Sequence, residues 1–244
     1  ILFFFSNKKP IIYLRSDGYE EYKSILGFYG PIFYSLMFNI VSKIGHFVSC
    51  NKDILKNKKG FVVNPSEIND HWIENTEKNS LEEIKLLYVG RVKVEKGIFS
   101  LLEIIKNSKI DISLSIVGAT QDSLKKISQE NVHVFPIQND ELKLIKFYDN
   151  HNIFVLPSFT EGHPMVLLEA LARQRPVIIF KDIENIVGNL KGIFVAERSA
   201  NSFFEITNYI KVNYEKIQLE MRNNLLPTKK QFIEEFSKFI LNLD

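Results

Sequence analysis

Short apolar runs alternate with longer amphipathic stretches along this chain of 244 residues. Most of the runs are continuous in Val, Ile, Leu and Phe, and strands of that kind are buried on both faces, as in parallel sheets. The pattern predicts strands at 10–14, 45–49, 60–63, 86–90, 112–118, 132–135, 153–156, 176–180 and 192–195.

Apolar positions at helical spacing lie between these strands. They predict helices at 96–107, 122–129, 140–150 and 165–173, and a further amphipathic helix at 229–243. Strand–helix alternation at this spacing is typical of βαβ units and doubly wound sheets. The fold class expected is therefore α/β.

A polar, acidic stretch at about 64–84 has no apolar periodicity and predicts an interdomain linker. It separates a partial domain, 1–72, from a Rossmann-like domain, 85–226. We expect the C-terminal helix, 227–244, to pack back on the first domain. The chain begins at Ile1 rather than at a methionine, so we expect a fragment of a longer protein.

The composition excludes several classes of protein. Apolar residues make up 45% and charged residues 25%, which is ordinary for a globular protein and excludes disordered, collagen-like and disulfide-scaffold chains. The net charge of +2 gives no reason to expect a nucleic-acid partner. A single cysteine, Cys50, indicates a reducing compartment.

Two apolar segments bear on membranes. Residues 1–5 are too few for a signal-peptide core. Residues 24–42 carry no charge and would be long enough to span, but glycines, a proline and an asparagine interrupt them. We expect a helix buried in a domain, although its aromatic residues, with Lys23 and Lys43 at the ends, would also suit a bilayer surface.

One segment carries most of the candidate chemistry: residues 157–172, PSFTEGHPMVLLEALA. Pro164 suits the first turn of a helix and Gly162 permits close backbone approach to a ligand. The free N–H groups at the start of this helix would form an anion site at the C-terminal edge of the sheet. These groups belong to His163, Met165 and Val166.

Two carboxylates flank the same helix start. Glu161 precedes it and Glu169 lies one and a half to two turns into it. Acids at this separation are common by chance. Glu161 could be a solvated acid near a helix start, and Glu169 a surface acid.

A second segment, residues 87–97, reads LYVGRVKVEKG. After the strand and Gly90, Arg91 and Lys96 would face one cleft, where fixed cations suit a diphosphate. Two cations on a solvated loop are the plain alternative.

Together the two segments resemble the Glu-x7-Glu and Gly-Arg-x4-Lys-Gly strings of retaining glycosyltransferases of family 4 type, the glycosyl transferases group 1. The resemblance implies a GT-B fold, with two Rossmann-like doubly wound parallel-sheet domains, the first incomplete here because complete enzymes extend further at the N-terminus. It also implies transfer of a hexosyl group from a nucleotide diphosphate sugar to an acceptor hydroxyl, with retention, in cell-envelope or polysaccharide glycan synthesis.

The resemblance assigns roles to residues. Arg91, Lys96 and the helix start would neutralise the diphosphate, Glu161 would bind the donor sugar, and Glu169 the ribose. The resemblance thus names Arg91, Lys96 and Glu161 as catalytic. It places around the donor Gly90, Gly118, Gln138, Gly162, His163, Pro164, Met165, Val166 and Glu169.

The partners expected are the nucleotide sugar, a glycan or lipid-linked acceptor, and a membrane surface touched peripherally by the first domain. The chain has no Asp-x-Asp string, so no metal is expected on the diphosphate. The resemblance implies no other cofactor. The location implied is cytoplasmic, at the inner face of the membrane.

The sequence departs from the family pattern at several positions. Pro136 and Gln174 stand where glycines are usual, and a Gly-Gly loop before Glu184 is absent. Ser16 or Asp17 stands near the position of an acceptor-side His, where a strand-to-loop turn is the alternative. These departures leave two other functions open: a non-catalytic nucleotide-sugar-binding relative, and a sugar-nucleotide epimerase on the same fold.

Overall fold

The computed structural model describes residues 9–74, 76, 81–107, 111–124 and 127–242; the apolar run 1–5 lies outside them. The chain divides into two compact units. Ile1–Ser66 and Pro227–Asp244 form the first, and Glu67–Leu226 the second. Each unit is built on its own parallel sheet.

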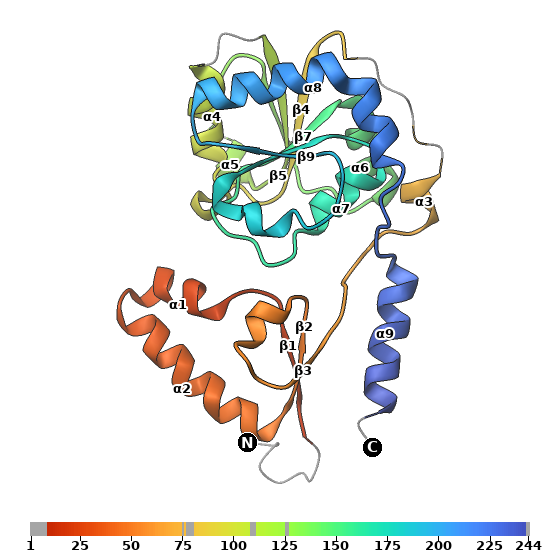
Figure 1. The fold of residues 1–244 in the computed structure, drawn as a ribbon. Coiled ribbons are helices and arrows are strands. Elements are labelled where there is room, and N and C mark those ends of the chain that lie inside the picture. The colour runs from red at the N-terminus through yellow and green to blue at the C-terminus, as the bar shows by residue number, and fades with distance from the viewer. Residues whose placement is uncertain (1–8, 75, 77–80, 108–110, 125–126, 243–244) are drawn as a thin grey trace. The chain divides into compact units, whose positions relative to one another are not determined.

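The second unit contains a six-stranded sheet of order β6-β5-β4-β7-β8-β9, with all neighbours parallel (Figure 1). Its interior strands are almost fully buried, as their continuous apolar sequences predict. The strands are β4 (Ile84–Val89), β5 (Ile112–Ala119), β6 (Val132–Pro136), β7 (Ile153–Leu156), β8 (Val177–Phe180) and β9 (Ile193–Ala196).

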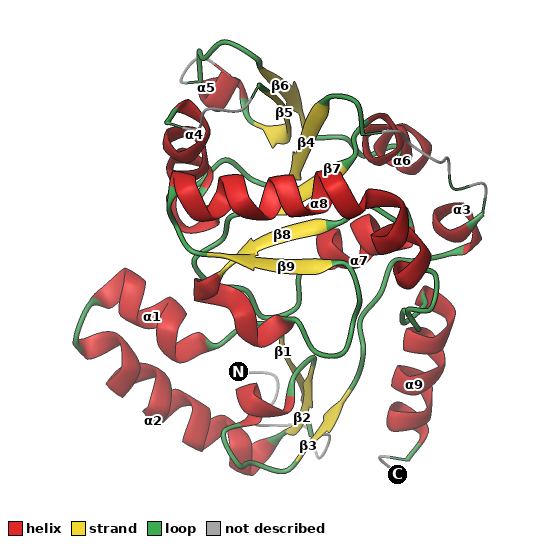
Figure 2. Cartoon of the chain, turned by 45° about the horizontal axis from the view of Figure 1, so that its top comes forward, coloured by secondary structure: helices red, strands yellow, loops and turns green. Residues whose placement is uncertain are grey.

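Helices cover both faces of this sheet. On one face α4 (Ile98–Lys106) lies beside α8 (Ala200–Met221), and α5 (Gln121–Leu124) follows β5 (Figure 2). On the other, α6 (Glu141–Asn150), α7 (Met165–Ala172) and α3 (Asp70–Ile73) pack together. Short 3-10 turns, η3 (Val94–Lys96) and η4 (Lys181–Ile186), follow β4 and β8.

The first unit has a three-stranded parallel sheet, β1 (Ile11–Leu14), β2 (His46–Ser49) and β3 (Gly60–Val62). Helix α1 (Gly18–Leu26) leads into α2 (Tyr29–Ile44), which stacks Phe38 on Phe47 at 5.0 Å. The turn η2 (Lys52–Leu55) joins β2 to β3.

Helix α9 (Lys229–Leu241) packs on the opposite face of this small sheet. Phe239 stacks on Phe61 at 5.1 Å and Phe236 lies 6.5 Å from Tyr13. Successive side chains of a strand point to opposite faces, so Tyr13 faces α9 while its neighbours Ile12 and Leu14 face the α2 side. The Glu235 carboxylate also accepts a hydrogen bond from the Asn64 backbone at 3.2 Å.

All nine predicted strands are present with bounds within two residues, but two helix predictions are wrong. Residues 24–42 are not one buried helix, because the chain breaks at Gly27 and the outer face of α2 is exposed. The helix expected at 122–129 does not reach residues 127–129. Among the described residues, no helix is long and apolar enough to cross a bilayer.

The stretch expected to be a linker also holds structure. Residues 70–73 form α3, and Trp72 is 2% exposed in the core of the second unit. Its ring meets Tyr148 edge-on at 5.5 Å. Because the residues around this tryptophan are polar, the sequence pattern does not predict that its side chain packs in the core.

Candidate active site

The strand order of the second unit reverses direction between β4 and β7, which defines a switch point. From β4 the chain proceeds to β5 and β6 on one side, and from β7 it proceeds to β8 and β9 on the other. Ligands of open α/β sheets bind at such a switch point, outside the C-terminal ends of the strands. The two candidate strings follow β4 and β7, the two strands that flank it.

Close backbone packing shapes the edge beside β4. Gly118 has φ +115°, and a Cβ there would lie 2.4 Å from the Gly90 carbonyl oxygen. The Gly90 N–H donates to the Val117 carbonyl at 2.8 Å. Of the predicted binding residues, Gly90 and Gly118 therefore lie together, and a side chain at 118 would force the two strand ends apart.

The loop after β4 also packs directly on the loop after β7. Gly97 has φ +67°, and a Cβ there would lie 1.8 Å from the Pro157 carbonyl oxygen. The Phe159 N–H donates to the Glu95 carbonyl at 3.1 Å. The switch point is thus closed by backbone contacts between the two candidate strings.

Lys96 and Glu161 form an ion pair across this contact. Lys96 Nζ lies 2.7 Å from Glu161 Oε1, and the same oxygen accepts a hydrogen bond from Ser158 Oγ at 2.6 Å. Their side chains are 22% and 11% exposed. A pair this sheltered is held in one arrangement, yet both groups remain reachable from solvent.

Tyr88 connects Arg91 to the same place. Its hydroxyl donates to the Arg91 carbonyl at 2.8 Å. Burial raises the pKa of Tyr88 well above its usual value; the Glu161 carboxylate raises that pKa further, while Arg91 lowers it. Arg91 and Glu161 therefore both act on one buried phenol, and the Arg91 side chain is exposed.

Helix α7 begins at Met165, as the sequence predicts, although Pro164 precedes the first turn instead of lying in it. Pro164 is the N-cap, and the first turn has neither a side-chain cap nor an acidic residue. Residues 161–166, which include Gly162, His163, Met165 and Val166, are half-buried. The positive end of α7 is therefore accessible and adjoins Glu161 in the chain.

Glu169 lies deeper than a surface acid would. It is 8% exposed and accepts a hydrogen bond from the Tyr148 hydroxyl at 2.7 Å. Burial raises the pKa of Glu169 to about 7, with Glu67 and Glu141 adding to the rise and the Tyr148 bond opposing it. The alternative that Glu169 is a surface acid is thereby excluded.

Two other candidates have local structural partners. Gln138 Oε1 accepts from the Asp140 backbone at 2.9 Å, so this side chain helps to begin α6. Asp17 caps α1 through the Tyr19 N–H at 3.0 Å and pairs with Lys56 at 2.7 Å. The turn-forming alternative for Asp17 accounts for the contact with Tyr19, and the ion pair with Lys56 is a tertiary contact.

Sequence reasoning missed Arg198, which lies between β9 and α8. Its guanidinium donates to the Pro157 and Ser158 carbonyls at 2.8 and 3.0 Å. One signal pointed to it: a cation one residue before the N-cap Ser199 is at the unfavourable, positive end of a helix, which indicates a different partner.

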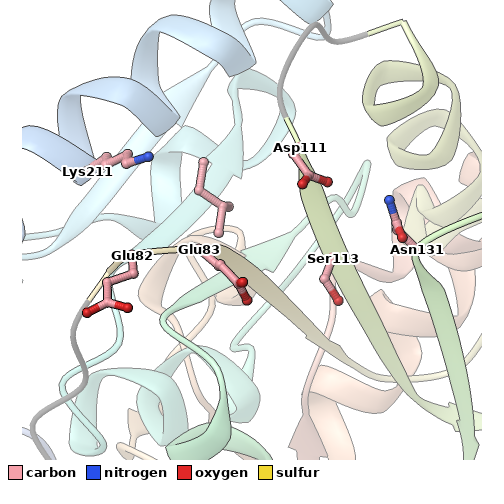
Figure 3. A pocket seen from close by; sticks show the side chains of 7 residues that line it. Glu82, Glu83, Asp111, Ser113, Asn131 and Lys211 are labelled. Carbon is pink, nitrogen blue, oxygen red and sulfur yellow. The ribbon is translucent and has the colours of Figure 1, made fainter.

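A hollow of about 340 Å³ lies at the other edge of the same sheet (Figure 3). Glu82 and Glu83 precede β4, and Asp111 precedes β5, so the lining is acidic. A negative lining repels a diphosphate. Among the described residues, no group of three or more His, Cys, Asp or Glu side chains is arranged to hold a metal ion.

Comparison with known proteins agrees with this geometry. Residues 70–226, more than half of the chain, match the family Glycosyl transferases group 1, and the chain belongs to that family. The matched region contains both strands of the switch point and every residue predicted for the donor site, whereas the acceptor-side candidates Ser16 and Asp17 lie outside it.

Two curated relatives are similar. The capsular polysaccharide biosynthesis glycosyltransferase CapM of Staphylococcus aureus is 30% identical over 169 residues, covering 63% of this chain and 42% of CapM. The putative teichuronic acid biosynthesis glycosyltransferase TuaC of Bacillus subtilis is 31% identical over 132 residues, covering 53% of this chain and 33% of TuaC. The chain therefore spans less than half the length of these relatives.

Among solved structures, Anabaena Alr3699/HepE in complex with UDP and glucose aligns with a TM-score of 0.71 and 12% identity, covering 98% of this chain and 72% of that one. The fold is GT-B, as the sequence resemblance implied.

Proposed function

We propose that this chain is the donor-binding part of a retaining glycosyltransferase. It would move a hexosyl group from a nucleotide diphosphate sugar to an acceptor hydroxyl in the synthesis of a polysaccharide or cell-envelope glycan. The observation that carries the proposal is the Lys96–Glu161 pair beside the start of α7, at the switch point of the sheet. The names of CapM and TuaC support the class of product.

In this proposal the leaving diphosphate is stabilised by fixed charge. Lys96, Arg91 and the N-terminus of α7 supply positive charge where negative charge develops. Glu161 accepts hydrogen bonds from the hydroxyls of the donor sugar, and Glu169 accepts them from the hydroxyls of the ribose. Lys96 keeps its ion pair with Glu161 until the donor arrives, so the site holds little uncompensated charge beforehand.

The decisive variant is Lys96→Met. We expect turnover to fall about 100-fold or more, because one contact to developing charge is worth about 2.7–4 kcal/mol. Lys93→Met is the matched control: Lys93 lies in the same loop, is exposed, and pairs with Glu95 only at 3.8 Å. Transfer by the Lys96→Met protein at the wild-type rate would contradict the assignment.

Binding and turnover measured with nucleotide sugars distinguish the glycosyltransferase from the two alternative functions. Binding of UDP-, GDP- or ADP-sugars without turnover would indicate a non-catalytic relative, and interconversion of the donor without an acceptor an epimerase. Proton NMR of the product tests retention, because inversion changes the coupling constant of the anomeric proton.

We also propose that the reaction needs no metal ion. The cations named above would replace one, and the sequence lacks an Asp-x-Asp string. Transfer rates should then be the same in EDTA as in Mg²⁺. A loss of activity in EDTA that Mg²⁺ or Mn²⁺ restores would overturn this part of the proposal.

The first unit is proposed to touch the cytoplasmic face of a membrane, where a lipid-linked acceptor would lie. Helices α1 and α2 and the turn between them expose many large apolar side chains, among them Phe28 at 82% and Phe33 at 59%. Residues 17–63, which contain both helices, carry six lysines against four acids. Apolar surface with excess positive charge suits anionic lipid.

Co-sedimentation with vesicles tests this contact. The protein should bind vesicles that contain phosphatidylglycerol and not pure phosphatidylcholine, and Phe28→Ser with Phe33→Ser should abolish binding. Val212→Ser, at an 83% exposed apolar position on α8, should not. Equal binding by both variants would contradict the proposal.

A further inference from the structure

Arg198 stands out because it comes from outside both candidate strings yet contacts both. It follows β9, two strands along from β7, and its side chain is 18% exposed. Its guanidinium is directed back toward the loop that carries Glu161.

Five groups hold the guanidinium in one orientation. Nη2 donates to the two carbonyls of residues 157 and 158, and Nε to Asp182 Oδ2 at 2.8 Å. The plane faces the rings of Phe159 at 3.8 Å and Phe180 at 4.6 Å. Planar, forked recognition of this kind is specific to arginine, since lysine has neither the plane nor the fork.

The contacts lead directly to the ion pair. Ser158 gives its carbonyl to Arg198 and donates its hydroxyl to Glu161 Oε1. That same carboxylate oxygen bonds Lys96. A displacement of the loop after β7 would therefore move the Glu161 carboxylate relative to Lys96.

The third nitrogen of Arg198 faces the loop after β4. Nη1 is buried without a hydrogen-bond partner among the described residues. A Cβ at Gly97 would lie 3.2 Å from it, so this nitrogen is packed against the loop that carries Lys96. A buried donor without an acceptor costs stability, and the bonds of Nη2 and Nε and the two ring contacts offset this cost.

We propose that Arg198 is a positioning residue: it fixes the loops after β4 and β7 against one another and thereby sets the geometry of the Lys96–Glu161 pair. The inference rests on the proposed function for its kinetic consequence only. A merely structural arginine would affect stability and leave the geometry of the pair unchanged.

The kinetic test compares Arg198→Lys with Arg222→Lys, an exposed arginine at the end of α8 whose bond to Gln174 is 3.5 Å long. In Arg198→Lys we expect kcat to fall about 10- to 100-fold with KM changed less than about threefold, because small misplacement of reacting groups lowers the rate of the chemical step. Arg222→Lys should keep both constants. An unchanged kcat in Arg198→Lys would overturn the proposal.

A double-mutant cycle with Ser158→Ala tests the route. Both changes act on one loop, so the loss in the double variant should be no greater than the larger single loss. Multiplication of the two losses would overturn the proposed route through Ser158.

Hydrogen exchange gives a readout that needs no activity. The Phe159 amide, bonded to Glu95, should exchange about tenfold faster in Arg198→Lys while core amides of β7 keep their protection. Unchanged exchange at Phe159 would overturn the positioning role, even in a protein that transfers no sugar. Absence of transfer by the wild type would overturn only the proposed function.

Discussion

At the scale of single residues, Glu169 shows how burial changes the properties of a side chain. The sequence shows how far Glu169 lies from Glu161 along the chain, but it does not show that Glu169 is buried. Its neighbours Tyr148 and Glu141 come from α6, and Glu67 comes from the segment before α3. Only the folded chain brings them together. Lys96 and Glu161 were both predicted at this site from the sequence, but their ion pair and the hydrogen bond from Ser158 to Glu161 were not.

We predict that Glu169→Gln stabilises the protein above pH 7. The pKa of Glu169 is raised from 4.5 to about 7 in the folded chain. The folded state therefore holds a proton that the unfolded state releases, and the free energy of unfolding falls as pH rises between these values. The glutamine has no proton to lose, so at pH 8 it should gain about 2–3 kcal/mol.

Urea unfolding at pH 5 and pH 8 measures this difference. Glu67→Gln, which removes a charge that raises the pKa of Glu169, should give a smaller change in the same direction. If Glu169 receives ribose hydroxyls, the stabilised variant should also bind the nucleotide sugar more weakly. Equal stability of wild type and Glu169→Gln at both pH values would contradict the prediction.

Arg198 and Gln174 also make contacts that cannot be predicted from the residues beside them in the sequence. Arg198 lies in a short polar turn, where nothing local shows which loop it contacts. Gln174 has φ 56°, so the departure from glycine does fall on a left-handed position. Its side chain donates to Thr76 at 3.0 Å, a compensation that lies about a hundred residues away in the chain.

At the scale of elements, the strands were predictable because a strand buried on both faces carries its signal in its own sequence. β7 and β8, with sequences IFVL and VIIF, are buried throughout. Helices α1 and α2 were not, because their exposed aromatic residues imitate a buried pattern. The face of α2 that packs on the sheet is set by its contact with β2, and the periodicity of the α2 sequence does not show this contact.

The contact between the loops after β4 and β7 yields an element-scale prediction. Gly97→Ala should destabilise the second unit by about 3 kcal/mol or more, since the new Cβ would meet the Pro157 carbonyl oxygen and the backbone is left-handed. The melting temperature of the second unit measures this loss.

Gly188→Ala is the control for that experiment. Gly188 has φ +56°, but a Cβ there meets nothing within 4 Å. It should cost only about 1 kcal/mol from backbone strain. Equal losses for the two variants would show that the loops do not pack as closely as described.

At the scale of the whole molecule, the chain leaves the first unit after Ser66 and returns to it at Pro227. The returning helix α9 covers the face of the small sheet that carries Tyr13 and Phe61. The amphipathic pattern of 229–243 predicted the helix. The aromatic contacts that seat it, made with strands more than 150 residues earlier, do not follow from that pattern.

Deletion of residues 227–244 should therefore affect the two units unequally. The first unit loses the cover of one sheet face and should unfold at lower temperature, while the second keeps its six-stranded core. Calorimetry with hydrogen exchange resolves the two transitions. A fall in protection throughout β7 and β8 would contradict this independence.

The return of α9 also fixes an order of events during synthesis. Every residue of Glu67–Leu226 leaves the ribosome before α9 does, so the second unit can complete its core while the first still lacks one cover of its sheet. Nascent chains that end at Leu226 and are tethered to the ribosome by an unstructured linker long enough to span the exit tunnel should resist protease in the second unit and be cut in the first. The late arrival of thirteen residues thus leaves Tyr13 and Phe61 uncovered in the nascent chain, where chaperones would have their opportunity to bind.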